Sequence, residues 1–89
     1  MNKMELYVKI CERAEKLGFK GERLSLLMDI ESADLKFDIR LEELLNADDS
    51  DFVHDISGII NNVDRDIFPA TDFGLFIPRF ASKIISRTK

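Results

Sequence analysis

The order of hydrophobic and polar residues along the chain predicts two helices in its first half. In residues 3–17 apolar side chains recur every three or four positions, which places them on one face of a helix, and charged residues fill the other face. Gly18 follows, and a glycine there can adopt the left-handed backbone that ends many helices. Residues 22–33 predict a second helix, whose water-facing side and end carry Asp29, Glu31 and Asp34.

A third long helix is predicted to begin at Asp48 and to run to about residue 63. Asp48 opens the helix, and Asp51 stands where the acid of a capping box stands. Negative charge at this end also complements the helix dipole. Behind this acidic start, an apolar stripe at helical spacing is expected to face the core: Phe52, Ile56, Ile59 or Ile60, and Val63.

Residues 35–41 alternate strictly between apolar and polar side chains, which is the periodicity of a strand. Asp38, however, is a good N-terminal cap for a short helix over 39–45. We favour an extended link as far as Phe37 followed by that short helix. A lone strand would need a partner, and only residues 73–77 offer one.

Residues 67–80 differ from the rest of the chain, because they hold four of the seven phenylalanines and both prolines. A short helix is predicted over 78–86, since proline suits the first helical position. The phenylalanines at 68, 73, 76 and 80 belong either to the core or to a contact surface. Together the elements predict an all-α single domain over residues 1–89: a small bundle of three main helices, a short connecting helix and a Phe/Pro-rich C-terminal segment.

The composition is that of a soluble globular domain. The chain has 89 residues, of which 45% are hydrophobic and 34% charged, so it can fill a modest core. No apolar run approaches the ~20 residues that cross a bilayer, and no signal-peptide pattern follows Met1, so we expect a cytoplasmic protein without membrane contact. Cys11 is the only cysteine and is expected to be a buried, inert thiol.

The residues that usually carry chemistry are too few to predict an enzyme. His54-Asp55 matches the dyad of metal-dependent phosphohydrolases, but such sites need further histidines and the chain has none. Residues 46–51 hold the acids of a calcium loop, yet Asp51 stands where the loop needs glycine and Ser57 where it needs glutamate. No nucleotide-binding motif occurs. We therefore predict a non-enzymatic protein with no catalytic residue, cofactor or metal, and leave open whether His54 is structural or at an interface.

The charge is concentrated in the middle of the chain. Residues 24–66 hold three Lys or Arg and twelve Asp or Glu, a net charge of −9 on a chain of net −4. Either this segment packs beside the basic ends, or it forms a face that binds a basic protein. On the second interpretation the candidate partner-binding residues are Asp48, Asp49, Asp51 and Asp55. The alternative is a small nucleic-acid-associated regulator that uses the basic tail (Arg79, Lys83, Arg87, Lys89), although the net negative charge disfavours nucleic-acid binding.

Several short motifs, which together cover most of the chain, resemble a family of small uncharacterised proteins of bacteriophages and prophages. They are LLMDIESA at 26–33, ADDSDFVHDISGI at 47–59, Arg65 and FIPRFA at 76–81. The resemblance transfers no activity and no site residue. It implies a phage or prophage accessory protein, whose partner would be a host or phage protein. The sequence is also compatible with a homodimer and does not identify the partner.

Overall fold

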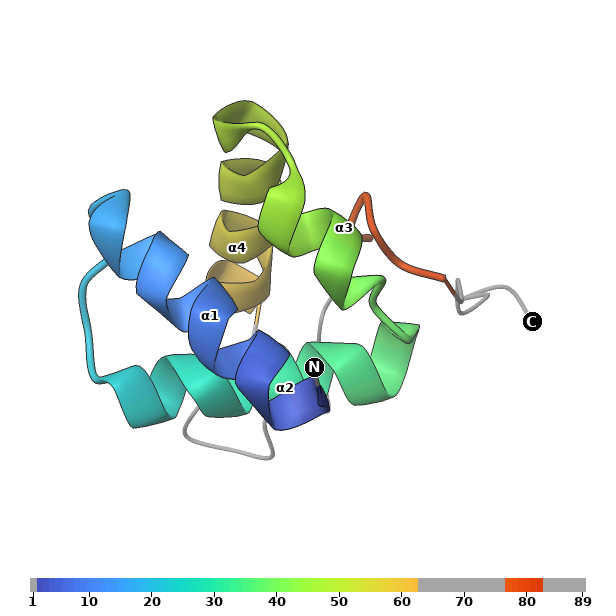
Figure 1. The fold of residues 1–89 in the computed structure, drawn as a ribbon, viewed down its shortest axis with the longest axis horizontal. Helices are drawn as coiled ribbons and strands as arrows, with labels where there is room; N and C mark the ends of the chain where they lie inside the picture. Colours follow the sequence, from blue (N-terminus) through green and yellow to red (C-terminus); the bar gives the residue numbers. More distant parts are fainter. Residues whose placement is uncertain (1, 63–76, 83–89) are drawn as a thin grey trace.

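The computed structural model describes residues 2–62 and 77–82, and four helices make up most of these ranges (Figure 1). They are α1 (Lys3–Lys16), α2 (Arg23–Phe37), α3 (Leu41–Asn46) and α4 (Asp49–Asn62). No strand occurs within the described ranges; the only pairing of strand type there is an isolated antiparallel bridge between Ile39 and Ala81. The all-α prediction is therefore confirmed for this part of the chain.

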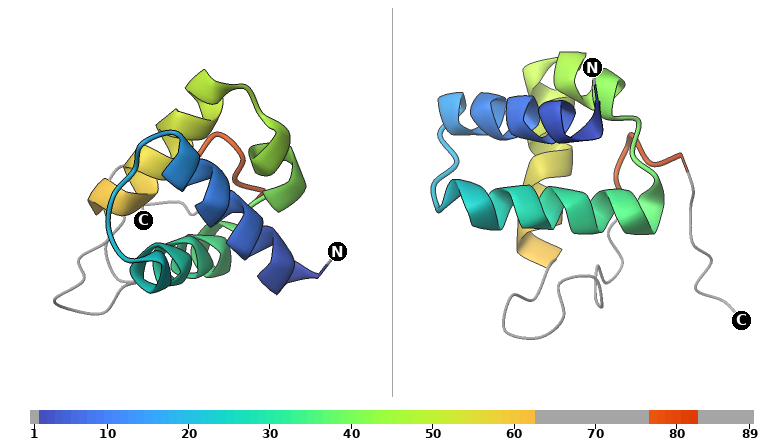
Figure 2. Two further views of the ribbon diagram at one scale, coloured as in Figure 1. Left: turned by 60° about the vertical axis from the view of Figure 1, so that its left-hand side comes forward. Right: turned by 60° about the horizontal axis from the view of Figure 1, so that its bottom comes forward.

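The helices enclose one hydrophobic core. α1 and α2 run roughly antiparallel, α3 packs on α1, and α4 packs against α2 (Figure 2). Side chains from all four helices are almost inaccessible to water in this core, with Ile10, Ala33, Leu44 and Phe52 as examples. None of the helices described combines the length and the apolar character needed to cross a membrane.

The ends of α1 follow the local chemistry of the sequence. At its start, the side chain of Asn2 accepts a hydrogen bond from the Glu5 amide, and the Glu5 carboxylate accepts one from the Asn2 amide, which completes a capping box. At its end, Gly18 has a φ of +103°, and the amide of Phe19 donates to the carbonyl of Ala14 at 3.1 Å. The predicted glycine stop is confirmed. The capping box is an Asn-x-x-Glu signal that our sequence analysis overlooked.

Helix α2 is longer than the sequence predicts. The predicted extended link to Phe37 is wrong, because the helix continues to Phe37, whose ring is buried in the core. Asp38 is not the N-cap of α3: it ends α2 in the left-handed conformation, with a φ of 54°, and its amide donates to the carbonyl of Asp34. The N-cap of α3 is Arg40, which makes no side-chain cap bond.

Residues 77–82 return to the helices and close the link between α2 and α3. The amide of Ser82 donates to the carbonyl of Asp38 at 2.9 Å, and the amide of Arg40 donates to the carbonyl of Phe80 at 2.8 Å. The partner of Ile39 is thus Ala81 rather than residues 73–77. Within 78–82 the chain forms a turn and the bridge, so the predicted helix does not begin at Pro78. Residues 83–86 and the phenylalanines at 68, 73 and 76 lie outside the described residues, and Phe80 packs partly buried against the core.

Burial confirms most of the predicted core and corrects three points. Cys11, Phe52, Ile56 and Ile59 are buried as expected. Leu17 was expected on the apolar stripe but is 37% exposed, because it caps the end of α1. Asp29 and Asp34 were expected on the wet side of the second helix but are buried, as both face the core side of α2. Val63 lies outside the described residues.

Candidate functional site

The four candidate partner-binding aspartates separate into two groups. Asp48, Asp49 and Asp51 are at the start of α4, with Asp48 and Asp49 exposed and Asp51 half-buried. Asp55, one turn further along, is completely buried. Helical spacing explains the difference: Asp55 lies between Phe52 and Ile59 on the face of α4 that meets the rest of the protein.

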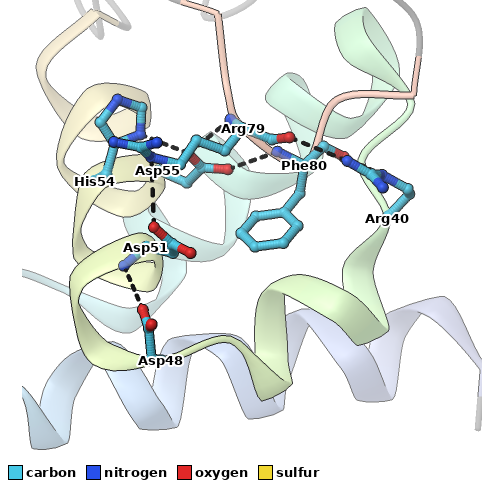
Figure 3. Close-up of polar contacts among 7 residues, drawn as sticks. All are labelled: Arg40, Asp48, Asp51, His54, Asp55, Arg79 and Phe80. Carbon is cyan, nitrogen blue, oxygen red and sulfur yellow. Dashed lines mark hydrogen bonds and ion pairs between the residues drawn. The ribbon is translucent and has the colours of Figure 1, made fainter.

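The Asp55 carboxylate fixes the returning C-terminal segment (Figure 3). It accepts hydrogen bonds from the backbone amides of Arg79 at 2.8 Å and Phe80 at 3.1 Å, and Nδ1 of His54 lies 2.8 Å from the same carboxylate. A turn leaves amide hydrogens without backbone acceptors, and a carboxylate forms the stronger, charge-assisted kind of bond with them. Asp55 therefore has a structural role, and its oxygens face inward rather than toward a partner.

The other three aspartates also contact the fold, but their carboxylates reach the surface. Asp48 caps α4, since its Oδ1 accepts the amide of Asp51 at 2.9 Å. Asp49 pairs with Arg13 at 2.9 Å and keeps 73% of its side chain exposed. Asp51 lies 3.7 Å from Nε of Arg79 and is 44% exposed. We had expected only one of these acids to be needed for the fold; two more contribute ion pairs.

Arg13 joins three helices at this point. Its guanidinium donates to the carbonyl of Leu45 at 2.7 Å, pairs with Asp49, and lies 4.4 Å from the centre of the Phe52 ring. The bond to Leu45 holds the end of α3, and the contacts with Asp49 and Phe52 hold the start of α4. The acidic start of α4 is therefore fixed in space by a half-buried cation of α1.

Two glutamates of α3 extend the acidic surface. Glu42 and Glu43 lie in the first turn of α3 and are exposed, with Glu43 paired to Arg40 at 3.0 Å. We call Glu42, Glu43, Asp48, Asp49 and Asp51 the acidic corner. The ion pairs among the described residues leave Glu42 and Asp48 without a cation. Our sequence analysis treated the two glutamates only as helix-start residues, although they belong to the same segment of net charge −9.

A second buried carboxylate, that of Asp34, ties α1 to the end of α2. Its oxygens accept hydrogen bonds from the Tyr7 hydroxyl at 2.7 Å and the Ile39 amide at 2.9 Å, and Nζ of Lys3 lies 2.9 Å away. Burial, together with the bond to Asp34, raises the pKa of Tyr7, and the bond to Asp34 raises the pKa of Lys3. Asp34 is thus structural, like Asp55.

The remaining candidate groups offer little nucleophilic or metal-binding chemistry. Burial raises the pKa of the Cys11 thiol to about 11, so the thiol stays protonated at neutral pH. Over residues 2–62 and 77–82, no group of three or more His, Cys, Asp or Glu side chains is placed to hold a metal ion. The arrangement that stands out chemically is the exposed acidic corner.

Comparison with known proteins gives a family but no function. Neither the curated proteins nor the solved structures contain a match to the chain. One family model matches residues 2–82, from the capping residue of α1 to the end of the returning segment. The chain therefore belongs to this family, DUF6874, a family of unknown function.

Proposed function

We propose that this chain is a non-enzymatic accessory protein of a phage or prophage, and that it binds a host or phage protein through the acidic corner. The observation that carries the proposal is the pair of exposed carboxylates on Glu42 and Asp48, which have no cationic partner among the described residues. The phage setting rests on the resemblance of the motifs at 26–33, 47–59 and 76–81.

The fold does not need all of this negative charge. A carboxylate near a helix start stabilises the helix by only about 0.3–1 kcal/mol when it is exposed. Capping of α4 uses the Asp48 oxygen as a hydrogen-bond acceptor, which a neutral asparagine could also provide. A basic protein surface would gain from the excess charge, because opposed charges speed association and make it sensitive to salt.

The structure allows this charge to be removed without disturbing the contacts of the fold. Glu42→Gln combined with Asp48→Asn removes two charges and leaves an acceptor at the helix cap. The matched control is Glu22→Gln with Asp38→Asn, which removes two charges from exposed positions at the two ends of α2. Asparagine tolerates the left-handed backbone at position 38.

The experiment is affinity capture from phage-infected or lysogenic bacterial cells, with the bound proteins identified by mass spectrometry. We expect the wild-type chain and the control variant to retain a basic partner that high salt releases, and the corner variant to lose most of it at the same salt. Equal capture by all three proteins would refute the acidic corner. Loss of binding only when Arg79, Lys83 and Arg87 are neutralised would favour the nucleic-acid alternative.

A further inference from the structure

The outer face of α2 is apolar although it points to water. Leu24 is 64% exposed, Met28 46% and Leu35 71%, and these are half of the large hydrophobic side chains exposed in the described ranges. We had expected Leu24 and Met28 to widen the inner stripe of the helix. They cannot, because Leu26, Ile30, Ala33 and Phe37 already fill the opposite, core-facing side.

The exposed residues form one line along the helix. Leu24, Met28, Glu31 and Leu35 follow each other at intervals of four, three and four residues, and all four are exposed. This spacing is that of the seam positions of a coiled coil, where hydrophobic residues alternate at intervals of three and four. Glu31 is the one polar residue in the seam. Figure 1 shows α2 along one edge of the helices, so the seam is not covered by α1, α3 or α4.

The seam is symmetric about its own midpoint. The positions 24 and 35 lie equally far from the centre of the line, and so do 28 and 31. In a two-fold dimer, one patch meets the same patch on the other subunit, so that each residue contacts its symmetric counterpart. An antiparallel pair of α2 helices would place Leu24 opposite Leu35 of the second copy, and Met28 opposite Glu31 of the second copy.

We propose that the outer face of α2 is a homodimer interface, in which the helices of two copies pair antiparallel along this seam. The inference is independent of the acidic corner, because it uses another helix and a different kind of contact. Three apolar side chains per copy form a smaller surface than the roughly 800 Å² that each partner of a stable complex buries. The dimer is therefore weak and forms at high protein concentration.

Glu31 sets the strength of the contact. The two Glu31 carboxylates approach each other across the two-fold axis, and like charges at close range oppose association. Glu31→Leu would complete the apolar seam and is expected to lower the dissociation constant at least tenfold. Leu35→Glu would add two more carboxylates to the seam and is expected to raise the constant at least tenfold. Both positions are exposed in the monomer, so neither change should alter its helicity.

Sedimentation equilibrium on the full chain, with concentrations up to about 1 mM, measures these effects. Glu42→Gln, on α3, is the control and should associate like the wild type. A wild-type chain that stays monomeric over this range would overturn the proposal and leave the seam to another partner. Association that does not respond to Glu31→Leu and Leu35→Glu would overturn it as well.

Disulfide cross-linking tests the antiparallel register separately. In a Cys11→Ala background, we would prepare Leu24→Cys and Leu35→Cys as single variants. The two positions lie about 16 Å apart along the helix, so antiparallel pairing brings 24 of one copy to 35 of the other and keeps identical positions apart. Oxidation should cross-link only the mixture. Cross-linking of each variant with itself, or of none, would contradict this register.

Discussion

The replacement Asp55→Asn tests how residues 77–82 are held to the helices. The Asp55 carboxylate accepts two backbone amides, from Arg79 and Phe80, inside a completely buried environment. An asparagine has one oxygen and one NH2 group, so it can accept one of these amides and must direct a donor at the other. The shape of the side chain is almost unchanged, which isolates the effect of the lost acceptor.

The magnitude follows from the lost bond and the new mismatch. A hydrogen bond to a charged group contributes about 1.5–3 kcal/mol, and a buried donor left without an acceptor costs about 1–3 kcal/mol. Removal of a buried charge offsets part of this cost. We expect a net loss of about 2–4 kcal/mol, which is a large share of the roughly 4–13 kcal/mol that a chain of this length has in total.

Urea unfolding followed by circular dichroism measures the loss. The matched control is Asp48→Asn, the same chemical change at an exposed cap, where asparagine is as good as aspartate and the loss should stay within about 0.5 kcal/mol. Hydrogen exchange should also show faster exchange of the Arg79 and Phe80 amides in the Asp55→Asn protein. If this variant loses less than about 1 kcal/mol and both amides keep their protection, the role assigned to Asp55 is wrong.

Three further changes probe the interior. Tyr7→Phe removes the hydroxyl that donates to buried Asp34 and should cost about 1.5–3 kcal/mol in urea unfolding, whereas a loss near zero would show that water replaces the bond. Ile56→Ala should cost about 2–5 kcal/mol, because Ile56 is fully buried; a loss below about 1 kcal/mol would place it outside the core. The raised pKa of Cys11 favours the protonated thiol in the folded state, so its contribution is complete below pH 9.0 and is lost as the pH rises through about 11. Stability measured at pH 8 and pH 11 should therefore fall by about 2–3 kcal/mol more in the wild type than in Cys11→Ala, and equal pH dependence would contradict the burial of the thiol.

Hydrophobic periodicity predicted the helices whose inner and outer faces differ clearly. α1 and α4 were placed within one or two residues, because apolar side chains mark one face, and Gly18 and Asp48 mark the ends. The end of α2 was missed for a physical reason. Leu35 is exposed on a helix, Phe37 is buried at its end, and Ile39 is paired with Ala81, so three different environments produced one alternating pattern.

The buried aspartates could not be recognised from the sequence. Asp34 and Asp55 have the same residue type as the exposed acids around them, and what separates them is a partner far along the chain. Tyr7 lies 27 positions from Asp34, and Arg79 lies 24 positions from Asp55. Local patterns carry no information on such contacts. The exposed members of the candidate site were easier to predict, because an acid at a helix start is exposed in most settings.

The most direct test of the acidic corner is to map where the captured partner binds. The purified partner would be added to the 15N-labelled chain, and the amide signals would be followed by NMR. The account predicts that the largest shifts cluster at Glu42, Glu43, Asp48, Asp49 and Asp51, and that they shrink as salt is added. Shifts confined to the outer face of α2 or to residues 77–82, with the acidic corner unchanged, would contradict it.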